Sequence, residues 1–391
     1  MKGVINMFVY DKGFDFDAKL NIRFRPGAVK GIGKELNMMS IKKVLVVSDT
    51  GVVNAGLHNG LIKSLDDEKI AYVLFTDVEP NPRDLTVEKA ALLAKDLMID
   101  AVIGIGGGSS LDTAKGVGFL ITNPGRLKDY NGKDKVKNDP VPIIAIPTTA
   151  GTGSEVTANA AITDAEQHIK MSVRSTKIIP SLAVLDPELL STLPKRVAAY
   201  SSMDALIHAI ESYLSTGANA LSDFFNLKAI DLISNYIRAF CANPSNTEAA
   251  GNMLLGSMFA GLGISNTGTG NAHAMGRALG GEYDMAHGLA CSVVFPYVMK
   301  FNLVAQPDKF VELAKVIGLA TIGLSKKEIG QKVVQEIFDL MDDLNIEINL
   351  SKLNVQKDTF ERMANVAINN VKPNPRKTTL QDLIRLFEES Y

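Results

Sequence analysis

Asp204 and His208 are the first pair of residues whose types and spacing could do chemistry. They lie four residues apart in the stretch 199–214, which contains neither Gly nor Pro and is predicted to be helical. Residues at this spacing leave the same face of a helix. Their apolar neighbours indicate that this face is buried, and a buried carboxylate beside a buried imidazole needs a partner. That partner is either a hydrogen bond within the pair or a metal ion.

A second stretch, residues 271–288, favours the metal ion. It carries His273 and His287 among small and Gly-rich residues, where the backbone can pass close to another group. One carboxylate and three imidazoles suit a divalent transition metal, iron(II) or zinc, with room for a substrate oxygen. We therefore predict that Asp204, His208, His273 and His287 bind a metal ion.

The stretch Gly104–Asp112 (GIGGGSSLD), between a predicted strand and a predicted helix, is a candidate site for a dinucleotide. Glycines let the backbone approach a pyrophosphate, and a helix start offers free N–H groups with a favourable dipole. A tight turn without a ligand is the alternative.

Asp49 ends the predicted strand 43–48. An acid there either hydrogen-bonds the ribose hydroxyls and repels a 2′-phosphate, or caps the helix that follows Gly51. Because Asp49 precedes Gly106, the order of the usual dinucleotide fingerprint is reversed, which argues against the standard Rossmann connectivity.

Together these residues resemble the group III iron-dependent alcohol dehydrogenases. The resemblance covers nearly the whole chain and is carried by Asp204, His208, His273, His287, the GGGS stretch Gly106–Ser109 and the PTTAGTGSE stretch Pro147–Glu155. It implies a dehydroquinate-synthase-like fold with a Rossmann-like α/β domain, whose sheet is mostly parallel, and an all-α C-terminal domain. It also implies an NAD-linked alcohol dehydrogenase working as an aldehyde reductase, with iron(II) as the expected metal and zinc as the alternative.

The resemblance further implies roles for single residues. The cofactor contacts would be Asp49 for the selection of NAD, Asn81, then Gly106, Gly107, Gly108, Ser109 and Ser110 for the pyrophosphate, Thr148, Thr149 and Thr152 around the adenosine, and Thr157 and Lys170 for phosphate or ribose. Asp112 would lie near the nicotinamide; alternatively it is a first-turn acid favoured by the helix dipole. Without the resemblance, Lys170 is only an exposed cation on a strand.

Arg277 departs from the family pattern, because many relatives carry His at this position, one helical turn after His273. Arg stays protonated and cannot shuttle a proton, but it can hold a carboxylate, sulfonate or phosphonate at two points. We therefore predict a preference for short aldehydes that bear an acid group, with Lys372 as a second positive charge. The alternative pairs Arg277 with Glu282 or Asp284 and leaves an uncharged alcohol or diol as substrate.

Two other functions compete with this interpretation. A sugar-phosphate cyclase of the dehydroquinate-synthase type shares the implied fold, but it needs several Lys and Arg for a phosphate and a different ligand set. The three-His pattern disfavours it. A metal-binding protein without catalysis is disfavoured by the cofactor motifs.

The elements that must position these residues change character along the chain. Strand and helix alternate at βαβ spacing up to Asp186–Pro187, and helical periodicity follows, so we expect domains at 1–186 and 187–391. The expected strands are 21–25, 43–48, 71–75, 101–105 and 141–146, with further strand pieces in 159–185. The expected helices of the second half are 195–215, 221–241, 247–265, 272–280, 287–301, 304–317, 326–344, 358–369 and 379–389.

Composition narrows the class of protein. The 391 residues are 46% apolar and 21% charged, as in an ordinary globular protein, and the net charge of −2 disfavours nucleic acid and anionic membranes as partners. Cys241 and Cys291 lie in apolar helical sequence without metal-type spacing and are interpreted as reduced core residues. His58 and His168 are expected in solvent. With no leader-like start or membrane-length apolar run, we expect a cytoplasmic enzyme for a small alcohol or aldehyde, forming a homodimer or higher homo-oligomer.

Overall fold

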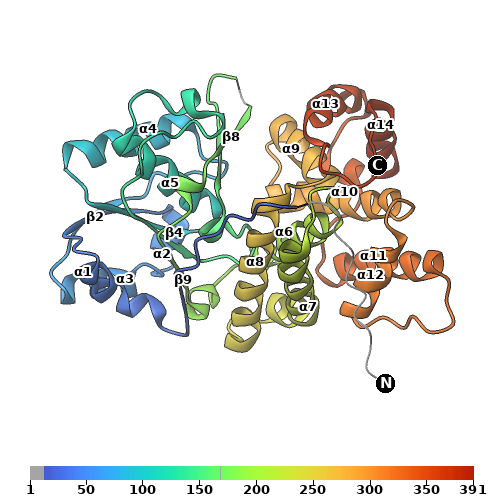
Figure 1. The fold of residues 1–391 in the computed structure, drawn as a ribbon, viewed down its shortest axis with the longest axis horizontal. Coiled ribbons are helices and arrows are strands. Elements are labelled where there is room, and N and C mark those ends of the chain that lie inside the picture. Colours follow the sequence, from blue (N-terminus) through green and yellow to red (C-terminus); the bar gives the residue numbers. More distant parts are fainter. Residues whose placement is uncertain (1–12, 168) are drawn as a thin grey trace.

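The computed structural model describes residues 13–167 and 169–391. The predictions for His168 and for the first 12 residues, where a leader-like segment would begin, lie outside the described residues. Figure 1 shows an α/β half beside a helical half. Within the described residues, all strands lie between Ile22 and Leu185, and the long helices that follow begin at Lys195. The predicted fold class is confirmed.

A six-stranded sheet forms the centre of the α/β half. Its strands pair in parallel in the order β1-β9-β6-β4-β2-β3. Their bounds are β1 Ile22–Phe24, β2 Lys43–Val47, β3 Ala71–Phe75, β4 Ala101–Gly106, β6 Ile143–Pro147 and β9 Leu182–Leu185. Gly106 at the end of β4 stands beside Pro147 at the end of β6. The register therefore places the two sequence motifs side by side at the carboxyl edge of the sheet.

Helices cover both faces of this sheet. In β2, Val44 and Val46 point into one apolar core, and Leu45 and Val47 point into the other, because successive side chains alternate. The helices are α1 Ile32–Met38, α2 Thr50–Asn54, α3 Asn59–Asp67, α4 Asp84–Asp96 and α5 Gly108–Thr122. A strand buried on both faces is apolar throughout, which explains the continuous run of β-branched residues.

A smaller sheet of three strands stands beside the main one. It comprises β5 Gly132–Lys133, β7 Asn159–Thr163 and β8 Lys170–Arg174, with β7 and β8 antiparallel. The two-residue strand β5 was not predicted, because two residues carry no periodicity. β8 begins with Lys170 and lies on the side of the α/β half that faces α9 (Figure 1).

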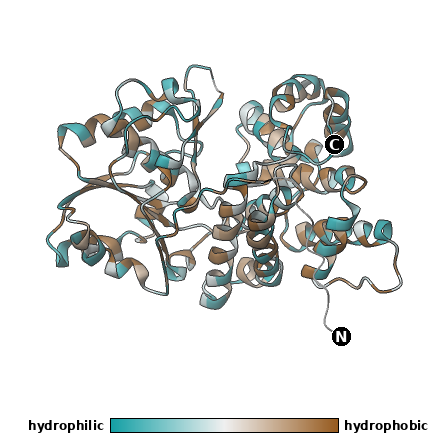
Figure 2. Ribbon diagram, in the orientation of Figure 1, coloured by the Kyte–Doolittle hydropathy of each residue, from teal (hydrophilic) through white to brown (hydrophobic). Residues whose placement is uncertain are grey.

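The helical half is built around α6, which packs against α7, α8 and α10. The helices are α6 Lys195–Leu214, α7 Ala220–Ala242, α8 Thr247–Thr267, α9 Asn271–Tyr283, α10 His287–Asn302, α11 Pro307–Val316, α12 Lys326–Asp343, α13 Phe360–Ala367 and α14 Leu380–Glu389. The predicted helix 358–369 is shorter than expected, because 3-10 turns flank α13. In Figure 2, the hydrophobic residues are concentrated in the strands of the sheet and in the central helices of the helical half.

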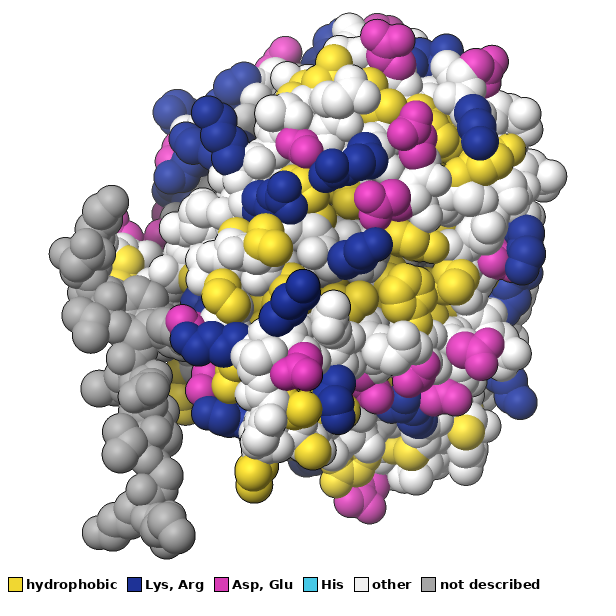
Figure 3. Space-filling model, turned by 90° about the vertical axis from the view of Figure 1, so that its right-hand side faces the viewer, with side chains coloured by type: hydrophobic (Ala, Val, Ile, Leu, Met, Phe, Trp, Pro, Cys, Tyr) yellow, Lys and Arg dark blue, Asp and Glu magenta, His cyan; other side chains and the backbone are white. Residues whose placement is uncertain are grey.

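The surface mixes charges of both signs. On the face drawn in Figure 3, Lys and Arg side chains alternate with Asp and Glu. Interspersed charges produce little long-range field of one sign on this face. None of the described helices is long and apolar enough to cross a membrane.

Candidate metal and cofactor site

Three helices bring the predicted metal ligands together. Nε2 of His273 on α9 lies 3.4 Å from Oδ1 of Asp204 on α6, and Nε2 of His287 on α10 lies 3.7 Å from the same oxygen. Asp204 and His273 are buried, and His287 is half-buried. His273 and His287, which follow Asp204 by 69 and 83 positions in the sequence, therefore meet at its carboxylate.

Two buried atoms of this cluster lack a partner. Oδ1 of Asp204 and Nε2 of His273 form no hydrogen bond with any described residue, because their 3.4 Å contact lacks hydrogen-bond geometry. A buried polar atom without a partner is destabilising by roughly 1–3 kcal/mol. A divalent cation between carboxylate and imidazole would satisfy both atoms, so the residues present fit a metal ion.

His208 lies at the cluster, but its Nδ1 contacts other oxygens than Oδ1 of Asp204, which the other two histidines share. Its Nδ1 lies 3.3 Å from the carbonyl oxygen of Gly151 and 3.8 Å from Oδ2 of Asp204. The ring stacks on His273 with centroids 4.4 Å apart. The role of His208 as a ligand stays a prediction.

A group that sequence reasoning left in the core supplies the fourth close ligand atom. The atoms that all lie within 4.8 Å of one another belong to Asp204, His273, His287 and Cys291. Sγ of Cys291 lies 3.8 Å from Nε2 of His287. Both residues stand one turn apart on α10, and this i,i+4 spacing was the available signal.

Glu211 is a second residue that sequence reasoning missed. One of its carboxylate oxygens accepts from Nδ1 of His273 at 2.7 Å and from the backbone N–H of Gly270 at 2.8 Å. The other oxygen accepts from the N–H of Ala272 at 2.7 Å. Glu211 follows Asp204 by seven residues, or two helical turns, and that spacing was the available signal.

Burial and neighbouring charges set the protonation of the cluster. Burial opposes the charge on Asp204, but His208, His287 and His273 outweigh it and lower the pKa of Asp204. Burial lowers the pKa of His208 to about 4 and holds the pKa of His287 well below its ordinary value. For His273, burial is outweighed by its contacts with Asp204 and Glu211, which raise its pKa to about 9. His208 and His287 are thus neutral near pH 7 and retain a lone pair for a metal.

The glycine turn after β4 is closely packed against the PTTAGTGSE stretch. A Cβ atom on Gly108 would lie 2.6 Å from the Thr152 side chain, and one on Gly107 would contact Thr149. Gly106 has φ 154°, and a Cβ atom there would lie 2.4 Å from Oγ of Ser110. A side chain at position 106 or 108 would therefore displace Ser110 or Thr152. The predicted pyrophosphate residues lie directly against Thr149 and Thr152, two of the residues predicted for the adenosine.

Asp49 has the structural role that was its alternative interpretation. It is the N-cap of α2, where Oδ1 accepts from the backbone N–H of Val52 at 3.0 Å. Its Oδ2 accepts from the Ser110 hydroxyl at 3.2 Å, which places the carboxylate beside the glycine turn. The capping role does not contradict the predicted contact with ribose, because Asp49 lies at the edge of the sheet where that contact would form.

The other predicted cofactor residues are partly occupied by contacts within the protein. The Asn81 side chain accepts from Nζ of Lys170 at 3.4 Å and donates to Asp284 at 3.2 Å. The Thr157 hydroxyl accepts from Nζ of Lys115 at 3.0 Å, and Thr148 is buried.

Asp112 braces the loop next to the glycine turn. It accepts from the Ser154 hydroxyl at 2.6 Å and from the N–H of Ala161 at 2.9 Å. Its predicted place near the nicotinamide stays a prediction.

The PTTAGTGSE stretch also joins the two halves of the molecule. The carbonyl of Gly151 contacts His208, and a Cβ atom on Gly151 would lie 2.8 Å from the Ser201 side chain of α6. A Cβ atom on Gly153 would lie 2.6 Å from Gly261 of α8. One loop thus runs from the glycine turn to the histidine cluster, and the two candidate sites are neighbours.

Arg277 is not paired with Glu282 or Asp284, so the pairing suggested as its alternative role is wrong, whereas the choice of substrate stays untested by these contacts. Glu282 forms an ion pair with Arg362, and Asp284 accepts from Asn81. The half-buried Arg277 instead donates to the amide oxygen of Asn370 at 3.3 Å. Burial lowers its pKa, and the neighbouring Cys291 and Glu211 act against this shift.

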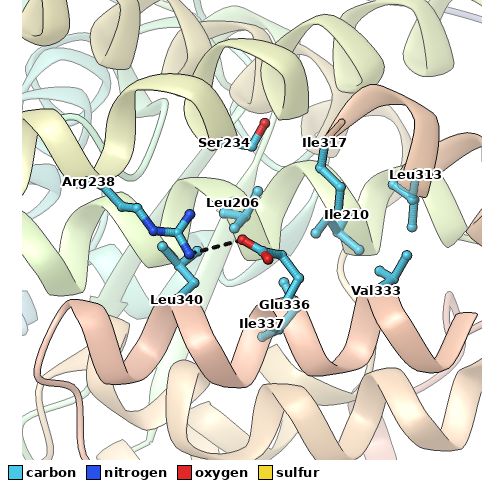
Figure 4. Close-up of a pocket in the computed structure, with 10 residues that line it drawn as sticks. All are labelled: Leu206, Ile210, Ser234, Arg238, Leu313, Ile317, Val333, Glu336, Ile337 and Leu340. Atoms are coloured by element: carbon cyan, nitrogen blue, oxygen red, sulfur yellow. Dashed lines mark hydrogen bonds and ion pairs between the residues drawn. The ribbon is translucent and has the colours of Figure 1, made fainter. Parts of the chain in front are cut away.

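The opposite face of α6 lines a separate, largely apolar crevice (Figure 4). Leu206 and Ile210 of α6 border it, together with side chains of α7, α11 and α12, and an ion pair between Arg238 and Glu336 crosses it at 2.9 Å. None of its lining residues belongs to the histidine cluster. α6 therefore separates a polar site from a packing face.

A parallel α/β half, a glycine turn and a buried carboxylate–histidine cluster together fit a metal-binding dehydrogenase. The family model of iron-containing alcohol dehydrogenase matches residues 20–187, and that of the Fe-containing alcohol dehydrogenase family, C-terminal, matches residues 198–391. The chain belongs to the iron-containing alcohol dehydrogenase family, whose members are oxidoreductases acting on CH–OH groups. The resemblance found in the sequence is confirmed.

Relatives match along nearly the whole chain. The NAD-dependent methanol dehydrogenase of Bacillus methanolicus is 35% identical over 366 residues, which cover 93% of this chain and 96% of that protein. A crystal structure of 1,3-propanediol oxidoreductase is 35% identical with a TM-score of 0.95, covering 97% of this chain and 100% of that one. A sulfoacetaldehyde reductase from Bifidobacterium kashiwanohense, in complex with NAD+, is 28% identical with a TM-score of 0.88, covering 97% and 98%.

Proposed function

We propose that this protein is an NAD-linked, metal-dependent aldehyde reductase for short aldehydes that bear an acid group. The observation that carries the substrate class is the environment of Arg277. This guanidinium stands one turn after His273, donates to the neutral amide of Asn370, and forms no ion pair with any described residue. A permanent cation that lies beside the histidine cluster without a counter-ion suits a substrate that carries a negative charge.

A second cation acts on the same region from the α/β half. Burial lowers the pKa of Lys170, Asp112 opposes this shift, and the charge of Arg277 adds to it. Lys170 also lowers the pKa of His287, after the larger effect of burial. Lys170 therefore acts electrostatically on both Arg277 and the histidine cluster. Lys372, predicted as the second charge, is exposed, so Lys170 is the better candidate for that role.

The residues of the chain divide the remaining tasks. We assign the pyrophosphate to the glycine turn Gly106–Ser110 and the ribose to Asp49, because the turn offers free N–H groups and Asp49 lies beside it. The nicotinamide would carry the hydride. We assign the metal to Asp204, His208, His273 and His287, where a bound ion would polarise the substrate carbonyl as a Lewis acid. Asp204 and His273 are buried, so this part of the site is shielded from bulk solvent.

The relatives support both the chemistry and the choice of substrate. One solved relative is a sulfoacetaldehyde reductase with NAD+, and sulfoacetaldehyde carries a sulfonate. The methanol dehydrogenase and the 1,3-propanediol oxidoreductase are named for uncharged substrates, which makes a dehydrogenase for short alcohols and diols the second candidate. The cyclase is not favoured, because the matched family consists of dehydrogenases. The domain division at Asp186–Pro187, the homo-oligomer and the cytoplasmic location stay predictions.

The test compares oxidation of NADH with an acid-bearing aldehyde and with an uncharged analogue of equal length. Purified protein loaded with iron(II) or zinc is used, as wild type and as Arg277→His. A two-point charged contact contributes roughly 1.5–3 kcal/mol, so we expect the wild type to prefer the acid-bearing aldehyde by about tenfold to a hundredfold in kcat/KM. Equal efficiency on both aldehydes would leave the uncharged alcohols as the substrates.

A further inference from the structure

Asn374 joins α9, which carries His273, to the far end of α10. Its Oδ1 accepts from the backbone N–H of Asn271, the first residue of α9, at 3.3 Å. The same oxygen accepts from Nδ2 of Asn302, the last residue of α10, at 3.0 Å, and Nδ2 of Asn374 donates back to Oδ1 of Asn302 at 2.8 Å. All three asparagines are buried. One side chain from the C-terminal part of the chain therefore connects the two helices.

The neighbours of the Asn374 amide fix its orientation. Oδ1 faces the backbone N–H of Asn271, and Nδ2 donates to the carbonyl oxygen of Arg376 at 2.8 Å. A flipped amide would place its NH₂ group against that N–H and its oxygen against that carbonyl, so only one orientation suits both contacts. A buried amide whose donor and acceptor are both satisfied holds its neighbours in one arrangement.

The first turn of α9 is held by side chains from outside the helix. The first N–H groups of a helix have no partner within it, and the N-cap residue of α9 is Gly270, which has no side chain to accept from them. Glu211 of α6 accepts from the N–H groups on either side of Asn271, and Asn374 accepts from Asn271 itself. A Cβ atom at position 270 would lie 2.9 Å from an oxygen of each acceptor. His273 is the third residue of this helix, so its place depends on how the first turn is held.

The residues on either side of Asn374 hold it in place. The carbonyl oxygen of Pro373 accepts at 2.9 Å from the N–H of Thr216, two residues past the end of α6. The guanidinium of Arg376 lies over the ring of Phe301 on α10 and donates to the carbonyl oxygen of that residue at 3.0 Å. Asn374 is therefore anchored both to the end of α6 and to α10, and it can hold α9 against them.

We propose that Asn374 is a positioning residue for the metal site. It holds the first turn of α9, and with it His273, against α10, while Glu211 holds the same turn against α6. The inference rests on the proposed metal site and deepens it by adding a residue that acts on a ligand without touching the metal. Without Asn374, the N–H of Asn271 would lose its acceptor and α9 its connection to Asn302. The His273 ring would then be less well placed to meet Asp204.

The first test measures the zinc affinity of the full-length protein by competition with a chelator. We expect Asn374→Ala to lower this affinity by about tenfold or more. Asn123→Ala is the matched control, since Asn123 is also buried and its Nδ2 donates to two backbone carbonyl oxygens, but it lies in the α/β half. This control should lower the Tm of the metal-free protein as Asn374→Ala does, and it should leave zinc affinity within about twofold of the wild type.

The second test places cobalt(II) in the site and records its visible absorption. The d–d bands of cobalt(II) depend on the number and geometry of its ligands, whereas a loss of stability alone does not change them. We expect altered bands in Asn374→Ala, because His273 is displaced. Asn123→Ala should keep the wild-type spectrum.

The outcomes separate this inference from the proposed function. A folded Asn374→Ala protein with the zinc affinity and the cobalt spectrum of the wild type overturns the inference and leaves the proposed function standing. The inference also fails if Asn123→Ala loses as much affinity as Asn374→Ala, since lost stability then explains both. Wild-type protein that binds no zinc, cobalt(II) or iron(II) overturns the metal site itself. If Asn374→Ala does not fold, Asn302→Ala decides, because it removes the connection to α10 alone: lowered zinc affinity supports the inference, and wild-type affinity overturns it.

Discussion

Nδ1 of His273 lies 2.7 Å from a carboxylate oxygen of Glu211. The same carboxylate accepts from the backbone N–H groups of Gly270 and Ala272, so it ties α6 to the first turn of α9. With Nδ1 held in this way, Nε2 of His273 is the atom that faces Asp204. A histidine oriented by a carboxylate is a common arrangement behind a metal ligand, because it fixes the ring and raises its basicity.

Glu211→Gln should therefore weaken metal binding by about tenfold to a hundredfold. Both oxygens of Glu211 accept hydrogen bonds, and a glutamine would have to turn its NH₂ group toward a donor on one side. The measurement is competition with a chelator for zinc, and Glu361→Gln on the exposed side of α13 is the control. Unchanged affinity in Glu211→Gln would mean that the Glu211 carboxylate does not support metal binding through His273.

The local patterns of the chain predicted its elements well. The runs of β2 and β3 begin at the predicted residues Lys43 and Ala71, because a strand buried on both faces has a nearly continuous apolar sequence. The common face of Asp204 and His208 also follows from helical periodicity alone. Patterns of this kind extend only over a few turns, so they locate elements and faces.

The rest of the site depends on tertiary packing. The seven-residue spacing places Glu211 on the face of Asp204, but its contact with His273 forms only when α9 packs against α6. Cys291 fitted an apolar core equally well until α10 packed on Gly276. The alternative pairing of Arg277 with Glu282 was wrong for the same reason, because Arg362 of α13 forms an ion pair with Glu282.

The second prediction concerns the choice between NAD and NADP. Asp49→Asn keeps an oxygen that can cap α2 through the N–H of Val52, and it removes the negative charge beside Ser110. We expect the ratio of kcat/KM for NADH over NADPH to fall by about tenfold, equivalent to about 1.4 kcal/mol. Asp100→Asn, at the other end of the sheet, is the control. If the ratio is the same in a folded Asp49→Asn protein, Asp49 serves only as a helix cap.

The third prediction concerns stability and pH. Glu155 is buried, its Oε1 has no partner among the described residues, and burial raises its pKa to about 7. Between about pH 4.5 and 7 the folded protein keeps this proton and the unfolded chain loses it. The stability that Glu155 contributes is therefore full below about pH 4.5 and is lost as the pH rises toward 7. Over that range the free energy of unfolding of the wild type should fall by roughly 1–3 kcal/mol, and Tm should fall with it.

Glu155→Gln should remove this component, since an amide does not titrate. Calorimetric scans of both proteins at several pH values between 5 and 7 make the comparison, with Glu166→Gln as an exposed control. Parallel curves for wild type and Glu155→Gln would show that the Glu155 proton is not linked to folding.

The last prediction uses the hydrogen bond between Arg277 and Asn370. At 3.3 Å to a neutral amide, this contact is weak, and an incoming carboxylate or sulfonate would replace it with a charged one at little loss. Arg277→Lys keeps the charge but lacks the planar fork, so it should retain part of the preference for the acid-bearing aldehyde. Arg277→Ala should lower kcat/KM for that aldehyde by about tenfold to a hundredfold and change the value for the uncharged analogue by less than about threefold. Lys377→Ala, an exposed cation of the C-terminal segment, should change neither value. If Arg277→Ala lowers both values equally, Arg277 supports the fold of α9 and does not select the substrate.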